Sequence, residues 1–222
     1  MSTETFWTQV GAYNEATWPV QTVMIVAALY LAVRVFFKPG PQTDAWMKAF
    51  LALAFAWNGI VFFLVFLRNP ISMAIGTPLF VIVSILFVVD SFAKKTHFSV
   101  PEGPWMRRFT IVWVLLAFLY PLIGWPLGHG YPRVLLPVFP CPLTVFATAL
   151  VAAAVPTPTP TPTADSRADS RVDRKVFIAL LPWGLLGLPK CFGALDCYED
   201  CVLFAGGVYG LVVLVKNWRL MK

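Results

Sequence analysis

The sequence predicts an all-α integral membrane protein with seven transmembrane helices, and three observations support this fold class. Of the 222 residues, 59% are hydrophobic and only 13% are charged, with a mean hydropathy of +0.74. Soluble domains are nearer half apolar and a quarter charged, so lipid is the expected solvent of this chain. The second observation is a series of apolar runs, and the third is an uneven distribution of lysine and arginine between the loops.

The apolar runs define the expected spans. A hydrocarbon core about 30 Å thick requires roughly 20 apolar residues of helix, and long runs of this kind favour helices over barrel strands. The predicted spans lie near residues 20–37, 46–67, 71–92, 109–127, 134–155, 176–195 and 201–218. Four charged residues crowd the turn between the last two spans, namely Lys190, Asp196, Glu199 and Asp200.

Lysine and arginine predict the orientation, because cytoplasmic loops carry the excess of these residues. One set of alternate loops, together with the C-terminus, holds fourteen of them, and the opposite set holds three, Arg68, Arg133 and Lys190. The fourteen are Arg34, Lys38, Lys48, Lys94, Lys95, Arg107, Arg108, Arg167, Arg171, Arg174, Lys175, Lys216, Arg219 and Lys222. We therefore expect an outside N-terminus and a cytoplasmic C-terminus in a bacterial inner membrane.

The segments outside the spans divide the chain into three parts within one membrane domain. Before the first span, apolar residues recur at helical spacing among polar ones, which predicts a short N-terminal helix in the outer interface. This helix and a five-span body make up residues 1–155. Residues 156–175 are rich in proline and threonine and then polar, which predicts a cytoplasmic linker. Residues 176–222 form the predicted two-span hairpin.

All four cysteines fall on the predicted outer side. Cys191, Cys197 and Cys201 surround the last outer turn, and Cys141 lies in the outer half of the fifth span. An oxidising periplasm favours one or two disulfides among these cysteines. The alternative is a soft-metal site for zinc or copper(I) that includes His129, although the spacing of the last three cysteines matches no specific metal motif.

Helix-breaking residues also gather in the predicted outer half. The stretch from Tyr120 to Pro132 and the prolines near Cys141 interrupt spans four and five. Broken helices expose backbone groups that transporters use to bind ligands, and ordinary proline kinks are the alternative. Asn58, midway along the second span, either lines a cavity or bonds to a neighbouring helix. Asp90 is expected to pair locally with Lys94 and Lys95.

The stretch Gly206-Gly-Val-Tyr-Gly210 places small residues four apart on the last span. Such a face allows close approach of a second helix, either from this chain or from another copy in a homo-oligomer.

Three motifs resemble an uncharacterised bacterial multi-pass membrane protein family, a domain of unknown function. They are Tyr13-Asn-Glu-Ala-Thr-Trp-Pro-Val-Gln21, Gly128-His-Gly-Tyr-Pro132 and Pro140-Cys-Pro-Leu-Thr144. The resemblance covers nearly the whole chain and implies no activity. The matching positions all lie on the predicted outer side: Tyr13, Asn14, Trp18, Pro19, Gln21, His129, Tyr131, Pro132, Pro140, Cys141 and Pro142. The three later cysteines depart from the pattern, which favours a local disulfide among them.

These features favour a transporter or permease for a small solute or metal ion, with an outward-facing site. The candidate ligand-binding residues are Tyr13, Asn14, Trp18, Gln21, Asn58, His129, Tyr131 and Cys141. The alternatives are an outward-facing sensor or membrane assembly protein, and a membrane-embedded thiol or redox enzyme. No catalytic or cofactor motif is present, and no basic run interleaved with aromatics suggests nucleic acid, so the lipid bilayer is the expected partner and no cofactor is predicted.

Overall fold

Helices make up the regular structure of the computed structural model, which describes residues 1–101, 103–155 and 172–221. No strand occurs within these ranges, so the all-α prediction is confirmed there. The remaining residues include 156–171 of the predicted linker, which lie outside the described part. The elements are α1 (Thr3–Phe37), α2 (Pro41–Trp57), the π-helix η1 (Asn58–Leu67), α3 (Pro70–Ala93), α4 (Pro104–Phe118), α5 (Tyr120–Gly124), η2 (Trp125–Leu127), α6 (Pro140–Ala153), α8 (Arg174–Leu185), α9 (Leu188–Cys191), η3 (Ala194–Asp196), α10 (Asp200–Lys216) and η4 (Trp218–Leu220).

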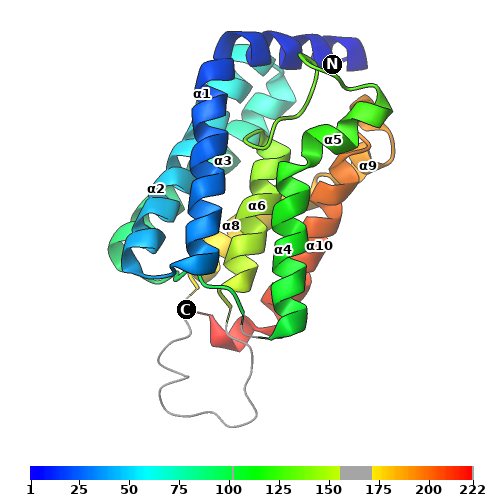
Figure 1. Cartoon of the computed structure of the whole chain (residues 1–222). Helices are drawn as coiled ribbons and strands as arrows, with labels where there is room; N and C mark the ends of the chain where they lie inside the picture. The colour runs from blue at the N-terminus through cyan, green and yellow to red at the C-terminus, as the bar shows by residue number, and fades with distance from the viewer. Residues whose placement is uncertain (102, 156–171, 222) are drawn as a thin grey trace, which may run out of the picture.

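The long helices run side by side, with α6 in the middle and α5 and α9 at one end (Figure 1). We call this the upper end, which also carries residues 119–139 and 186–199. The lower end carries the turns around residues 38–40 and 94–101. The first part of α1 lies across the upper end before the helix turns down along the bundle, and Pro19 lies within this helix (Figure 1). The N-terminal segment is therefore helical, as its apolar spacing predicts.

Among the residues that the structure describes, three elements are long and apolar enough to cross a membrane, so the prediction of seven spans is wrong. They are α1, the continuous α2–η1 unit and α3, and a fourth arises if α4 is joined to α5–η2 across a 64° bend. The other apolar helices are shorter: α6 has 14 residues, α8 has 12 and α10 has 17. At 1.5 Å per residue, α6 extends only about 21 Å.

The physical reason is that hydropathy does not distinguish lipid-facing residues from buried ones. Every residue of α6 is buried, because neighbouring helices surround it. A helix that is apolar all round fits a protein core as well as a lipid environment. The predicted fifth span also began at residue 134, whereas the helix starts at Pro140 and residues 134–139 are not helical.

The outer surface of α1 carries apolar side chains at helical spacing. Val23, Val26 and Val33 are all exposed, whereas Met24 and Leu31 face the core. Polar residues would occupy the exposed positions if this face met water. An apolar outer face on a helix of spanning length is therefore the pattern of a helix that contacts lipid.

Proline starts several helices rather than interrupting them. Pro41, Pro70, Pro104 and Pro140 each occupy the first turn of a helix. The fixed backbone angle of proline suits this position, where its missing N–H has no intrahelical partner to lose. At the start of α3, Asn69 also caps the helix, accepting hydrogen bonds from two backbone N–H groups at 3.1 Å.

The small residues of α10 pack against helices of the same chain. A Cβ atom added at Gly207 would lie 2.7 Å from the carbonyl carbon of Gly184 in α8, and one at Gly210 would lie 2.7 Å from Thr148 in α6. Glycine therefore permits the close approach of α10 to both helices. Of the two partners expected for the Gly206–Gly210 face, the internal one occupies it.

Candidate functional site

Three polar residues predicted to bind a ligand instead hold the non-helical segment 128–139. The amide of Asn14 donates to the carbonyl oxygen of Pro132 at 2.6 Å, and that of Asn58 donates to Val138 at 2.9 Å. Gln21 donates to the Asn14 side-chain oxygen at 3.0 Å and thereby orients it. The backbone carbonyl groups of this segment have no helical partners, and the buried amides donate hydrogen bonds to them. Buried backbone groups need such partners because water cannot reach them.

The aromatic candidates divide into buried and exposed residues. Tyr13 is fully buried, its hydroxyl accepts a 2.8 Å hydrogen bond from Trp57 Nε1, and its ring packs edge-on against Phe139. Trp18 and Tyr131 are 55% and 62% exposed. Tyr13 is therefore a core residue in this structure, whereas Trp18 and Tyr131 lie on the surface.

His129 lies at the upper end, where it contacts both the start of α1 and the segment before α10. Its Nδ1 is 2.9 Å from Glu199 Oε1, and its ring stacks on Trp7 with 3.8 Å between centroids. The Trp7 indole donates to the carbonyl oxygen of Leu195 at 2.9 Å. Burial raises the pKa of Glu199 above its usual value, and the nearby His129 opposes this rise. The start of α1 is thereby fixed to the segment before α10.

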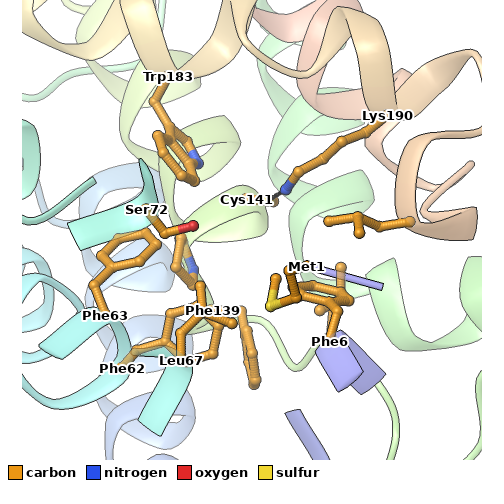
Figure 2. Close-up of a pocket in the computed structure, with 13 residues that line it drawn as sticks. Met1, Phe6, Phe62, Phe63, Leu67, Ser72, Phe139, Cys141, Trp183 and Lys190 are labelled. Atoms are coloured by element: carbon orange, nitrogen blue, oxygen red, sulfur yellow. Dashed lines mark hydrogen bonds between the residues drawn. The ribbon is translucent and has the colours of Figure 1, made fainter. Parts of the chain in front are cut away.

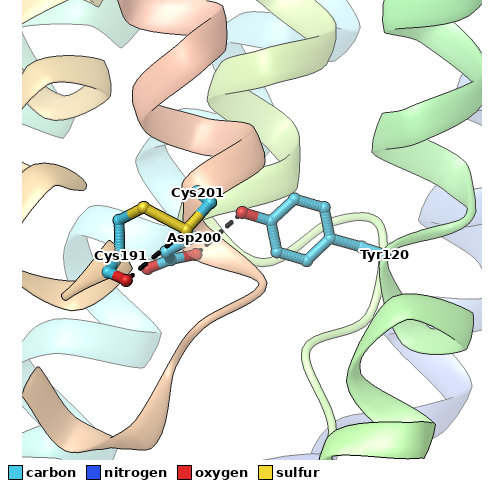
Figure 3. Close-up of a disulfide and its surroundings, with 4 residues drawn as sticks. All are labelled: Tyr120, Cys191, Asp200 and Cys201. Carbon is cyan, nitrogen blue, oxygen red and sulfur yellow. Dashed lines mark hydrogen bonds between the residues drawn. A yellow bond between two sulfur atoms is a disulfide. The ribbon is translucent and has the colours of Figure 1, made fainter. Parts of the chain in front are cut away.

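Asp200 is the hub of a second buried cluster at the same end. Its carboxylate accepts from the Tyr120 hydroxyl at 2.8 Å and from the Cys141 thiol at 3.2 Å, and it pairs with Lys190 Nζ at 3.0 Å (Figure 3 shows the Tyr120 contact). Burial lowers the pKa of Lys190, but Asp200, Cys141 and Cys197 together more than offset burial and raise this pKa well above its usual value. Lys190 is therefore an ammonium ion that Asp200 neutralises.

Cys141 serves as a hydrogen-bond donor in this cluster. A thiol that donates to a carboxylate retains its proton, and the side chain is buried. Reactive cysteines need thiolate character and access, so this geometry favours a structural role over the thiol or redox enzyme alternative.

A disulfide joins Cys191 to Cys201 beside Asp200 (Figure 3). Of the three clustered cysteines, Cys191 and Cys201 form this bond, whereas Cys197 is a free, buried thiol. Burial raises the pKa of Cys197, which keeps it protonated. The disulfide ties the segment that carries Lys190 to the start of α10.

Replacing both Cys191 and Cys201 by serine is expected to lower the free energy of unfolding by about 3 kcal/mol, because the disulfide closes a loop of 10 residues. Thermal unfolding in detergent, with and without reductant, measures the effect. Cys197→Ser is the matched control and should leave the reductant dependence intact. An unchanged melting temperature on reduction of the native protein would contradict the prediction.

A cavity of about 60 Å³ opens beside Cys141 and Lys190 of the second cluster. Figure 2 shows Lys190, Cys141 and Trp183 on one side and phenylalanine rings on the other. Trp183 Nε1 is buried, and beyond the weakly accepting Cys141 sulfur it has no hydrogen-bond partner. The wall is completed by Met1, Phe6, Phe62, Phe63, Leu67, Ser72, Leu135, Phe139, Pro140 and Leu195. We call this space the upper cavity.

A second cavity, of about 330 Å³, lies at the lower end between the start of α2 and the end of α3. Its wall includes Lys48, which pairs with Asp90 at 3.1 Å, and Asp44, which contacts His97 at 2.7 Å. We call this space the lower cavity. The expectation that Asp90 pairs with Lys94 and Lys95 is therefore wrong for their side chains, although Asp90 accepts a hydrogen bond from the Lys95 backbone N–H.

Sequence reasoning identified His129 and Cys141 but not their partners. Lys190, Glu199 and Asp200 were recognised only as charges crowding a turn. Charged side chains next to apolar spans can indicate a buried polar cluster, because a charge that is buried there needs a partner. Trp7 and Trp183 carried no such signal, because aromatic residues are frequent throughout the chain.

Within the described residues, no group of three or more His, Cys, Asp or Glu side chains is arranged to hold a metal ion. His129 instead stacks on Trp7 and pairs with Glu199.

A family model described as "Family of unknown function (DUF6064)" matches residues 3–222, so the chain belongs to this family. The match spans the chain, as the resemblance of the three motifs implied, and it brings no activity. No curated protein and no solved structure matches the chain.

Proposed function

Because membership of a family of unknown function supplies no activity, we propose from the geometry that this protein is a permease for a small solute in a bacterial inner membrane. The upper cavity is its outward-facing site, and the lower cavity faces the cytoplasm. The observation that carries the proposal is the position of the cavities at opposite ends of the same helix pair, α2–η1 and α3. The lysine and arginine distribution supports this orientation.

The two cavities are separated by a column of buried aromatic rings. Phe63, which lines the upper cavity, packs on Phe80 at 5.2 Å between centroids. Phe80 packs on Phe55 at 5.1 Å, and Phe55 lies 6.0 Å from Phe87, one turn before the lower cavity. A solute that crosses must displace these rings, so the described state is closed at its centre. Apolar constrictions close other membrane pathways in the same way.

The π-helix η1 supplies an element suited to such a movement. This helix spans the ten residues Asn58–Leu67 and carries Phe63 of the aromatic column. The π-helical form is rare and frequently occurs at functional sites. Rearrangement of η1 would shift Phe63 relative to Phe80 without breaking α3.

The proposal is tested by uptake of isotope-labelled solutes into proteoliposomes. The panel is acetamide, acetate and acetamidinium, which share one heavy-atom skeleton and differ in charge. We expect at least one of them to enter faster than into protein-free vesicles. Uptake no faster than in those vesicles for all three would reject the permease, and binding without uptake would favour the sensor alternative.

Phe80→Leu is expected to increase the rate of uptake severalfold, because it replaces the central ring of the column with a smaller side chain. Phe92→Leu is the matched control: it lies on the same helix, is 82% exposed and should leave the rate unchanged. Stability must be measured in parallel, since large-to-small core substitutions are destabilising. Equal rates for both variants would contradict the gating role of the column.

A further inference from the structure

The chemistry of the upper cavity restricts what it binds. Most of its wall is apolar, formed by phenylalanine rings and aliphatic side chains such as Leu67 and Leu135. Such a wall favours a ligand whose body is apolar. The few polar groups must then determine which head group the ligand carries.

The main polar groups on this wall are hydrogen-bond donors. The Trp183 indole N–H is buried next to the Cys141 sulfur, which is a weak acceptor, and makes no other hydrogen bond; indole nitrogen only donates. Lys190 has three N–H bonds; Asp200 accepts at 3.0 Å and Cys141 Sγ lies at 3.6 Å, which leaves a third. The Cys141 proton is directed to Asp200. A buried donor whose only neighbour is a weak sulfur acceptor is poorly satisfied, so a ligand oxygen that accepts its hydrogen bond stabilises the site.

The local charges disfavour an ionic ligand. Lys190 is already neutralised by the buried Asp200, so an anion would add an unpaired charge to an apolar cavity. A cation would lie beside the Lys190 ammonium ion and offer the indole N–H no acceptor. An uncharged acceptor satisfies the donors and leaves the charge unchanged.

The volume sets the size of the ligand. A cavity of this type needs roughly 10–15 Å³ to hold one water molecule, so about 60 Å³ suits four or five non-hydrogen atoms. Ser72 Oγ also lines the wall and can accept from a ligand N–H.

We propose that the upper cavity binds a small, uncharged carbonyl compound, of which a short primary amide is the best match. The carbonyl oxygen accepts hydrogen bonds from Trp183 and Lys190, and the alkyl part contacts the aromatic wall. A compound of this class would be the substrate of the permease. That the cavity is where the substrate enters rests on the proposed function.

Binding of acetamide, acetate and acetamidinium to the purified protein in detergent tests the inference. Ligand-observed NMR is suitable because affinity is limited for so few atoms, with Kd on the order of 0.1 mM at best. We expect acetamide to bind more tightly than either ion. Tighter binding of acetate or acetamidinium would overturn the inference, as would the absence of acetamide binding.

Trp183→Phe retains an aromatic ring and removes the donor, so acetamide should bind about fivefold more weakly. Trp125→Phe is the matched control, because that side chain is 70% exposed and does not line the cavity. Thermal unfolding verifies that both variants fold. If Trp183→Phe binds acetamide as tightly as the native protein does, the cavity is not the binding site and the inference fails.

The two proposals fail in different ways. Acetamide binding that depends on Trp183, without uptake into proteoliposomes, supports the carbonyl site and rejects the permease. Acetate uptake with preferential acetate binding supports the permease and rejects the carbonyl class.

Discussion

Lys48→Met is expected to lower the free energy of unfolding by about 3–5 kcal/mol, because it leaves Asp90 as an unpaired buried charge. Lys48 and Asp90 have side chains only 2% and 0% exposed, and their charged atoms lie 3.1 Å apart. Lys48 also donates to the Asp90 carbonyl oxygen at 3.2 Å. One substitution therefore removes both the ion pair and a hydrogen bond between α2 and α3.

A second substitution should recover part of this loss. In the double variant Lys48→Met/Asp90→Asn the unpaired charge is removed, while the asparagine oxygen can still accept from the backbone N–H groups of Lys95 and Thr96. We therefore expect the double variant to be more stable than Lys48→Met alone. This coupling between the two sites is the signature of a direct interaction.

Thermal or denaturant unfolding in detergent measures both variants. Lys38→Met serves as the control, since Lys38 is exposed near the same end of the bundle. A Lys48→Met variant that loses no more stability than Lys38→Met would show that the buried pair contributes little.

Gly207→Ala is expected to lower the free energy of unfolding by about 1–3 kcal/mol or more, as overpacked helix contacts do. The new Cβ atom would meet Gly184 backbone at 2.7 Å, and backbone cannot rotate away as a flexible side chain can. The helices α8 and α10 must then separate. The same helices carry Trp183 and Asp200, so acetamide binding should weaken in this variant as well.

Gly206→Ala provides a matched control at the adjacent position. Its added Cβ atom would lie 3.5 Å from the Trp113 ring, which is ordinary contact. Alanine also favours helix by up to about 1 kcal/mol over glycine, so this variant should be neutral or stabilising. Equal stability of the two alanine variants would contradict the assigned contact between α8 and α10.

The sequence predicted the helical class correctly because apolar runs and turn residues are local properties. It also placed the first three spans close to the observed helices, since α1, α2–η1 and α3 are continuous and apolar along their length. In the later part of the chain, proline and glycine divide the apolar runs into short helices and extended segments. Composition alone gave no way to distinguish a buried α6 from a lipid-facing span.

The candidate site was only partly predictable for a similar reason. The motif residues Asn14 and Asn58 are important to the fold, but their role depends on the carbonyl groups that the 128–139 segment brings to them. In the sequence, an asparagine that binds a ligand cannot be distinguished from one that binds the backbone. The poorly satisfied indole of Trp183 could be found only from the tertiary structure, which shows which buried donors have partners.

The sequence by itself determined that the chain is helical, that some of its helices are long and apolar enough to cross a membrane, and that basic residues are concentrated in alternate loops. The tertiary structure decided how many helices reach spanning length, and that Lys190, Cys141 and Tyr120 converge on Asp200. The reason is physical: hydropathy and helix breaking act over neighbouring residues. Pairing of buried charges depends on side chains that are distant in sequence and meet only when the helices pack.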